Sequence, residues 1–180
     1  MSDLSGSDAR EEGVRLFQRG DYGKALAAFE TAASQFAATG DEAGQAEALN
    51  NLGVVQRVRG DRKAAMHTFM VAAAIFARLG DVGRRGQVLG NLGDLYAANR
   101  ERREAARCYS EAAALLAQAG DMERQSRVLR ALSLLTLRQG RWLEAMVRME
   151  ESLTAAPRVS LMQRLFRRLL RFVLGMMGVS

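Results

Sequence analysis

The side chains that most often carry enzyme chemistry are scarce in this sequence of 180 residues. It has one histidine, His67, and one cysteine, Cys108. We expect His67 to have a surface or packing role and Cys108 to pack in the interior, as free cysteines usually do. Adjacent carboxylates at 11–12 and 150–151 fall near expected helix ends, where they favour the helix dipole. The sequence therefore predicts no enzyme, no metal site and no cofactor.

Asparagine and arginine offer a different chemistry, because asparagine returns at a fixed spacing. Asn51 begins an Asn-Leu-Gly triplet that recurs forty residues later at Asn91, in the same apolar setting. An asparagine amide both donates and accepts hydrogen bonds, so a row of them can bind the backbone of an extended peptide whatever its side chains. Arginines can pair with carboxylates through two parallel hydrogen bonds. These residues favour binding of a protein segment.

Turns at a spacing of twenty residues organise the chain that must position these side chains. Gly-Asp stands at 20–21, 40–41, 60–61, 80–81 and 120–121, with Arg100-Glu101 and Gly140-Arg141 at the two remaining steps. Glycine tolerates the left-handed conformation that ends a helix, and the next aspartate can cap the helix that follows. Between the turns, apolar residues recur at the three- and four-residue spacing of amphipathic helices. A period of forty residues therefore predicts a stacked array of four helical pairs.

The residues within each forty-residue unit resemble the pattern of the tetratricopeptide-repeat (TPR) family. The glycine position of the first helix holds Gly13, Gly53, Gly93 and Ser133. The first alanine position of the second helix holds Ala25, Ala65, Ala105 and Ala145. The aromatic position of the second helix holds Phe29, Phe69, Tyr109 and Met149. The closing proline appears only once, as Pro157, which indicates longer second helices in the other units. The units are most similar to the forty-residue repeats of cell-polarity adaptors and kinesin light chains.

The resemblance covers residues 9–157 and implies an all-α fold. We expect a right-handed α-solenoid of four TPR helical hairpins, plus a C-terminal amphipathic helix. The expected domain 1–157 divides into repeats at about 5–39, 40–79, 80–119 and 120–157, and the basic helix occupies 158–180.

The resemblance also implies that the first helix of each pair lines a concave groove, where a segment of a partner protein would lie. The expected partner-binding residues are Arg10, Val14, Phe17, Asn50, Asn51, Val54, Arg57, Asn91, Asp94, Arg127 and Arg130, with Gly90 and Leu134 beside them.

The C-terminal segment carries most of the net charge of +6. Residues 158–180 hold five arginines and no acid, so the rest of the chain has a net charge of only +1. A nucleic-acid-binding domain should be basic on its folded body, so we expect no nucleic-acid partner. On a helical wheel the apolar residues of this segment cover about half of the circle opposite the arginines, and only Leu174 lies outside that arc. The residues of this membrane or cap helix are Leu161, Arg164, Leu165, Phe166, Arg167, Arg168, Leu169, Arg171, Phe172 and Met176.

Three roles for this helix follow from its pattern. It could cap the array or fold back into the groove, lie on an anionic membrane surface, or be offered to a partner or a second copy. The matching functions are a non-enzymatic scaffold or assembly adaptor, a peripheral membrane protein, and a regulator inhibited by its own tail. The single cysteine and a polar start without a secretory pattern favour the cytoplasm, with a place at the inner face of a membrane under the second role.

Overall fold

The computed structural model describes residues 5–157 and 159–178, and within those ranges it contains nine helices. The helices are α1 (Gly6–Gln18), α2 (Tyr22–Thr39), α3 (Glu42–Arg59), α4 (Arg62–Arg78), α5 (Val82–Ala98), α6 (Arg102–Gln118), α7 (Met122–Leu137), α8 (Trp142–Ala155) and α9 (Leu161–Met176). The outer ends of the expected segments, 1–4 and 179–180, and Arg158 at their boundary lie outside the described residues.

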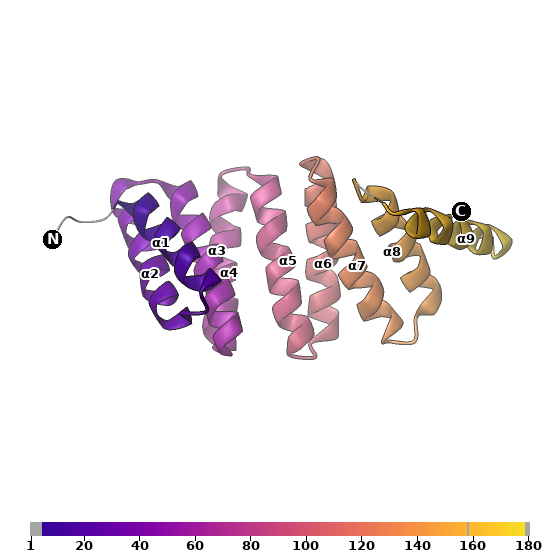
Figure 1. Ribbon diagram of the computed structural model, residues 1–180, viewed down its shortest axis with the longest axis horizontal. Coiled ribbons are helices and arrows are strands. Elements are labelled where there is room, and N and C mark those ends of the chain that lie inside the picture. The colour runs from indigo at the N-terminus through magenta and orange to yellow at the C-terminus, as the bar shows by residue number, and fades with distance from the viewer. Residues whose placement is uncertain (1–4, 158, 179–180) are drawn as a thin grey trace.

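The helices stack as consecutive pairs into an elongated, curved row, with α9 crossing its C-terminal end (Figure 1). Each of α1, α3 and α5 also contacts the next odd-numbered helix, whereas no described even-numbered helix contacts the next even-numbered one. The row therefore curves with α1, α3, α5 and α7 on its concave side. The predicted all-α solenoid of helical hairpins with a C-terminal helix is confirmed.

The turns between helices use the predicted Gly-Asp chemistry. The six glycines that close helices have φ between 69° and 87°, and they are Gly20, Gly40, Gly60, Gly80, Gly120 and Gly140. Asp21, Asp41, Asp81 and Asp121 each accept a hydrogen bond from the backbone N–H three residues on. Asp61 makes no such bond and lies 3.5 Å from Nε of Arg59 instead. At the fifth position of the series, Arg100 adopts φ 64° in place of a glycine.

A contact between a glycine and an aromatic ring joins the two helices in each of the first three pairs. A Cβ atom on Gly13, Gly53 or Gly93 would lie 2.7 Å from the ring of Phe29, Phe69 or Tyr109, respectively. The rings themselves are buried. The absence of a side chain on these glycines therefore lets each ring lie directly on the backbone of the facing helix.

The fourth pair replaces this contact with hydrogen bonds. Ser133, at the glycine position, donates from Oγ to the carbonyl of Ala145 at 2.7 Å. The hydroxyls of Ser126 and Ser152 each donate to the other residue's carbonyl, at 2.8 and 2.7 Å. All of these hydroxyls are buried and satisfied, so the departure from the repeat pattern at Ser133 preserves close helix packing.

Replacing Gly53 with alanine should destabilise the array, because the new methyl group would meet the buried ring of Phe69. We expect the free energy of unfolding to fall by about 1–3 kcal/mol, the usual cost of overpacking a core. Urea unfolding followed by circular dichroism measures it. Gly23→Ala is the matched control, since a Cβ there meets nothing within 4 Å. Equal stability of the two variants would contradict the role of the glycine–ring contact.

Replacing Arg100 with glycine should stabilise the protein. A left-handed non-glycine residue costs about 1–2 kcal/mol, whereas the extra unfolded-state freedom of glycine costs about 0.5–1 kcal/mol. We expect a net gain of up to about 1 kcal/mol in the free energy of unfolding. The control Arg103→Gly, at an exposed position of α6, should instead lower the free energy of unfolding by about 1 kcal/mol. A loss of stability in Arg100→Gly would show that its side chain matters more than its backbone conformation.

Candidate functional site

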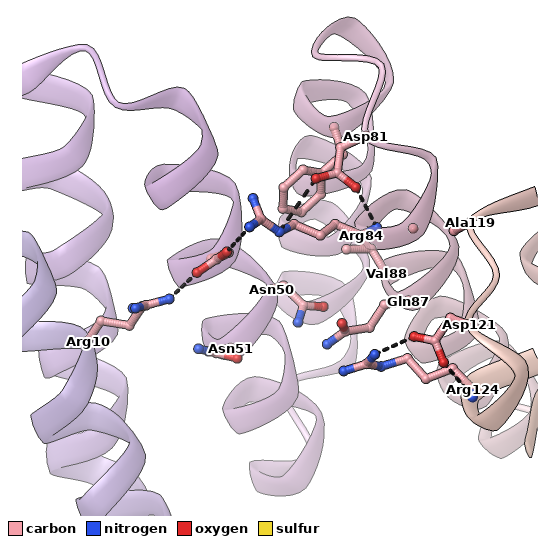
Figure 2. A pocket seen from close by; sticks show the side chains of 13 residues that line it. Arg10, Asn50, Asn51, Asp81, Arg84, Gln87, Val88, Ala119, Asp121 and Arg124 are labelled. Atoms are coloured by element: carbon pink, nitrogen blue, oxygen red, sulfur yellow. Dashed lines mark hydrogen bonds and ion pairs between the residues drawn. The ribbon is translucent and has the colours of Figure 1, made fainter. Parts of the chain in front are cut away.

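The concave side contains a pocket of about 520 Å³ between α1, α3, α5 and the start of α7 (Figure 2). Its lining is mostly polar. The residues are Arg10, Glu47, Asn50, Asn51, Phe76, Asp81, Gly83, Arg84, Gln87, Val88, Ala119, Asp121 and Arg124. Three arginines and three acids balance in charge, so the pocket suits a polar ligand more than a strongly charged one.

A chain of ion pairs crosses the rim of this pocket. Glu47 on α3 pairs with Arg10 of α1 and, at 3.1 Å, with Nη2 of Arg84 on α5. Nε of Arg84 also lies 3.5 Å from Asp81, and its guanidinium carbon lies 5.9 Å from the centre of the Phe76 ring. These pairs are partly exposed and each contributes little to stability. Together they hold Arg10 and Arg84 in fixed positions on either side of Glu47.

The pocket contains three side-chain amides, of which one is hydrogen-bonded to another side chain of the protein and two are not. Asn50 is only 6% exposed, and its Oδ1 accepts a hydrogen bond from Nδ2 of Asn91 at 2.8 Å. Asn51 and Gln87 make no side-chain hydrogen bond with any residue in the described ranges. Figure 2 shows these amides grouped between Arg10 on one side and Arg124 on the other. The pocket therefore offers two amides whose donors and acceptors remain open to a ligand.

A second pocket of about 260 Å³ continues the groove toward α7 and shares Gln87 and Arg124 with the first. Asp94 lines it, and its carboxylate accepts a hydrogen bond from the hydroxyl of Tyr109 at 2.6 Å. Gly90 lies at the same wall, where a Cβ would approach Val128 of α7 to 3.3 Å. The two pockets form one path along the concave face.

The remaining predicted residues of the groove have different surroundings. Val14 is exposed and lines a shallow pocket with Arg10 and Asn51. Arg127 and Arg130 are exposed at the C-terminal end of the concave face, near Pro157. Leu134 is exposed one turn further along α7. These residues are accessible to a partner.

Three predicted groove residues contribute mainly to packing. Phe17 is partly buried and its ring centre lies 5.5 Å from that of Tyr22, while Val54 packs against the central core. Nε of Arg57 is buried without a hydrogen-bond partner in the part of the chain that the structure describes. All three side chains are half-buried.

Among the lining residues that sequence reasoning did not predict, four polar ones follow the forty-residue period. They are Glu47, Arg84, Gln87 and Arg124. A signal was present: Glu47 and Gln87 stand forty residues apart, as do Arg84 and Arg124. Extending the predicted face backward by one helical turn would have found Glu47, Gln87 and Arg124, whereas Arg84 lies two turns before Asn91.

The described residues contain no cluster of three or more His, Cys, Asp or Glu that could hold a metal ion. His67 is exposed, and Cys108 is buried. Burial raises the pKa of the Cys108 thiol, so this cysteine keeps its proton and is a poor nucleophile at neutral pH.

The other predicted site is α9, which contacts α8 and no other described helix. Leu170 and Leu174 are its buried residues, although Leu174 was the residue expected to be out of place. Arg171 donates from Nε to Glu150 of α8 at 2.6 Å, and Arg167 is half-buried. Besides Arg171, the exposed residues of the predicted set are Leu161, Arg164, Leu165, Phe166, Arg168, Leu169, Phe172 and Met176.

The bond between Tyr109 and Asp94 predicts a pH-dependent contribution to stability. Burial first, and then the hydrogen bond to Asp94, raise the pKa of the Tyr109 phenol above its usual value of 10.0. Above pH 10 the unfolded chain releases this proton while the folded chain keeps it, so stability falls as pH rises. At pH 7 the free energy of unfolding of Tyr109→Phe should be about 1 kcal/mol lower than that of the wild-type protein. Above pH 10 this difference between the two proteins should shrink by up to about 1.4 kcal/mol per pH unit. Urea unfolding of both proteins from pH 7 to 11 measures it; a constant difference would contradict it.

Solved structures show the same fold at low sequence identity. BtubC (BKLC) from P. vanneervenii has a TM-score of 0.75 at 21% identity, over 86% of this chain and 68% of that chain. The TPR-like repeats of a kinesin light chain from P. anserina have a TM-score of 0.69 at 18% identity, over 81% and 72%. PilF of Pseudomonas aeruginosa has a TM-score of 0.69 at 23% identity, over 93% and 68%.

These likenesses confirm the predicted TPR-like repeat fold. No curated protein matches the sequence closely enough to count as a relative. The family model for soluble NSF attachment protein, SNAP, matches residues 19–170, and the chain therefore belongs to this family of TPR-like helical repeats.

Proposed function

We propose that this protein is a non-enzymatic scaffold that holds an extended segment of a partner protein in the concave groove. The observation that carries the proposal is the pair of amides, Asn51 and Gln87, that line the main pocket without a hydrogen-bond partner among the described residues. Repeat arrays generally use extended concave surfaces for binding. The binding unit is the set of four repeats within residues 1–157.

The amides suit the backbone of an extended peptide. Asn51 lies on α3 and Gln87 on α5, so the two amides sit on neighbouring first helices of the array. Each can donate to a backbone carbonyl and accept from a backbone N–H, which requires no particular partner side chain. A hydrogen bond from Asn91 to Asn50 links the same two helices. Recognition of the backbone would thus rest on a preorganised surface.

The C-terminal end of the groove supplies charge. Arg130 forms no ion pair within 5–157 and 159–178, and Arg127 has only Glu123 at 3.6 Å, with both side chains well exposed. Arg10, at the other end, is already paired with Glu47. A partner carboxylate would therefore bind beside α7, which gives the bound segment a direction.

A regulator inhibited by its own tail requires a different arrangement. Because α9 contacts only α8 among the described helices, it would have to leave α8 to reach the pockets between α1, α3, α5 and α7. The name of the matching family refers to attachment to NSF. We propose protein binding in general and assign no particular partner.

Selection of phage-displayed random peptides on the full chain tests the groove. We expect selected peptides to bind the wild-type protein and to bind Asn51→Ala/Gln87→Ala about tenfold or more weakly. Two lost hydrogen bonds are worth about 2 kcal/mol, and about 1.4 kcal/mol corresponds to a factor of ten. Fluorescence anisotropy with a labelled peptide measures the affinities.

The matched control is Ser34→Ala/Gln118→Ala, two exposed polar residues on the even-numbered helices α2 and α6. This variant should bind the selected peptides as the wild-type protein does. Circular dichroism verifies that both variants fold. If no peptide is selected, or if both variants keep full affinity, the groove does not bind extended segments through these amides.

A further inference from the structure

The helix α9 leaves most of its apolar surface uncovered. Six large side chains are between 51% and 75% exposed, and we call them the apolar strip: Leu161, Met162, Leu165, Leu169, Phe172 and Met176. The helix nevertheless has a well-formed start, where Ser160 and Gln163 cap each other's backbone. An ordered helix that exposes six contiguous large apolar residues marks an interaction surface.

The array covers a different face of α9. Leu170 and Leu174 pack against α8. Arg171 donates hydrogen bonds from Nε to Glu150 of α8 and from Nη2 to the hydroxyl of Thr154, the latter at 3.4 Å. At 3.6 residues per turn, Leu165 and Leu170 point about 140° apart. The apolar strip therefore faces away from the array while α9 stays attached to it. Figure 1 shows α9 crossing α8 and extending beyond the end of the row.

Positive charge borders the apolar strip on one side. Arg164, Arg168 and Phe172 follow one another at four-residue spacing, so the two arginines lie next to the strip. Both arginines are exposed, and Arg171 alone of the described α9 residues forms an ion pair. The segment 158–180 contains no acidic residue. An apolar strip flanked by unpaired arginines is complementary to an anionic lipid surface, whose acyl boundary takes the strip and whose head groups take the arginines.

We propose that α9 binds an anionic bilayer through the apolar strip and through Arg164 and Arg168, while Leu170, Leu174 and Arg171 keep it on α8. The helix would lie in the plane of the interface and hold the C-terminal end of the array at the membrane. No helix in the described part of the chain is long and apolar enough to cross a membrane. The proposal concerns α9 alone and is independent of what the groove binds.

Charge also argues against a second copy as the occupant of the strip. Two α9 helices that joined their strips would bring arginines from both chains together, with no acid on either helix to offset them. Lipid head groups supply the negative charge that such a dimer lacks. The observations thus favour a bilayer over self-association.

Co-sedimentation of the full chain with phosphatidylcholine vesicles, with and without phosphatidylserine, tests the proposal. We expect binding to the phosphatidylserine vesicles, at least about tenfold weaker binding to the neutral ones, and release at high salt. Leu165→Ser/Phe172→Ser and Arg164→Gln/Arg168→Gln should each weaken binding about tenfold or more. All four changes lie on the exposed side of α9 and leave its contacts with α8 intact.

Matched controls carry the same changes elsewhere. Met70→Ser/Leu79→Ser alters two exposed apolar residues at α4, and Arg102→Gln/Arg103→Gln alters two exposed arginines of α6. Both controls should bind vesicles as the wild-type chain does, and circular dichroism verifies folding of every variant.

Three results would overturn the proposal. The full chain could stay in solution with both kinds of vesicle, or it could bind while the changes in α9 have no more effect than the controls. Light scattering could instead show a dimer that Leu165→Ser/Phe172→Ser dissociates, without vesicle binding. That last result would make a second copy of the chain the occupant of the strip.

Discussion

The packing of an aromatic ring on a bare glycine backbone sets the distance between the two helices in each of the first three pairs. Phe69 on Gly53 is the clearest case, because the ring is fully buried and a methyl group would already be too large. Once this distance is the same in successive pairs, the pairs stack with a constant offset, and positions forty residues apart line up along the array. The bond between Asn50 and Asn91 depends on that alignment, and so does the shape of the groove.

The groove uses some of its polar residues to hold itself together and leaves others open. Glu47 connects α1, α3 and α5 through two arginines, and Tyr109 holds the carboxylate of Asp94. Asn51 and Gln87 lie on α3 and α5 as well, but their side chains make no hydrogen bond with any described residue. Because the internal bonds already restrain the helices, binding of a segment would cost little conformational entropy in the groove itself. Stability of the array and readiness to bind thus come from neighbouring positions on the same surface.

The C-terminal end of the array is covered incompletely. A solenoid needs its last apolar face protected, and α9 does this with two leucines and one ion pair to α8. The arc of apolar residues on α9 is much wider than this contact requires, so the excess faces outward. One short helix can therefore protect the array with one face and meet a second surface with the other.

The sequence by itself determined the helices, their turns and their pairing, because Gly-Asp steps and the glycine, alanine and aromatic positions act through local contacts or contacts within one pair. The resemblance to the TPR family, which those same positions carry, implied that the first helix of each pair faces the groove. Tertiary structure alone decided which polar side chains remain open there: Asn50 is bound by Asn91, forty-one residues away, whereas Asn51 beside it is not. Tertiary structure also decided which residues of α9 are buried: packing against α8 buries Leu174, although this residue lies outside the apolar arc. Such choices depend on how separate pairs come together in space, and hydrophobic periodicity within one helix carries no information about that.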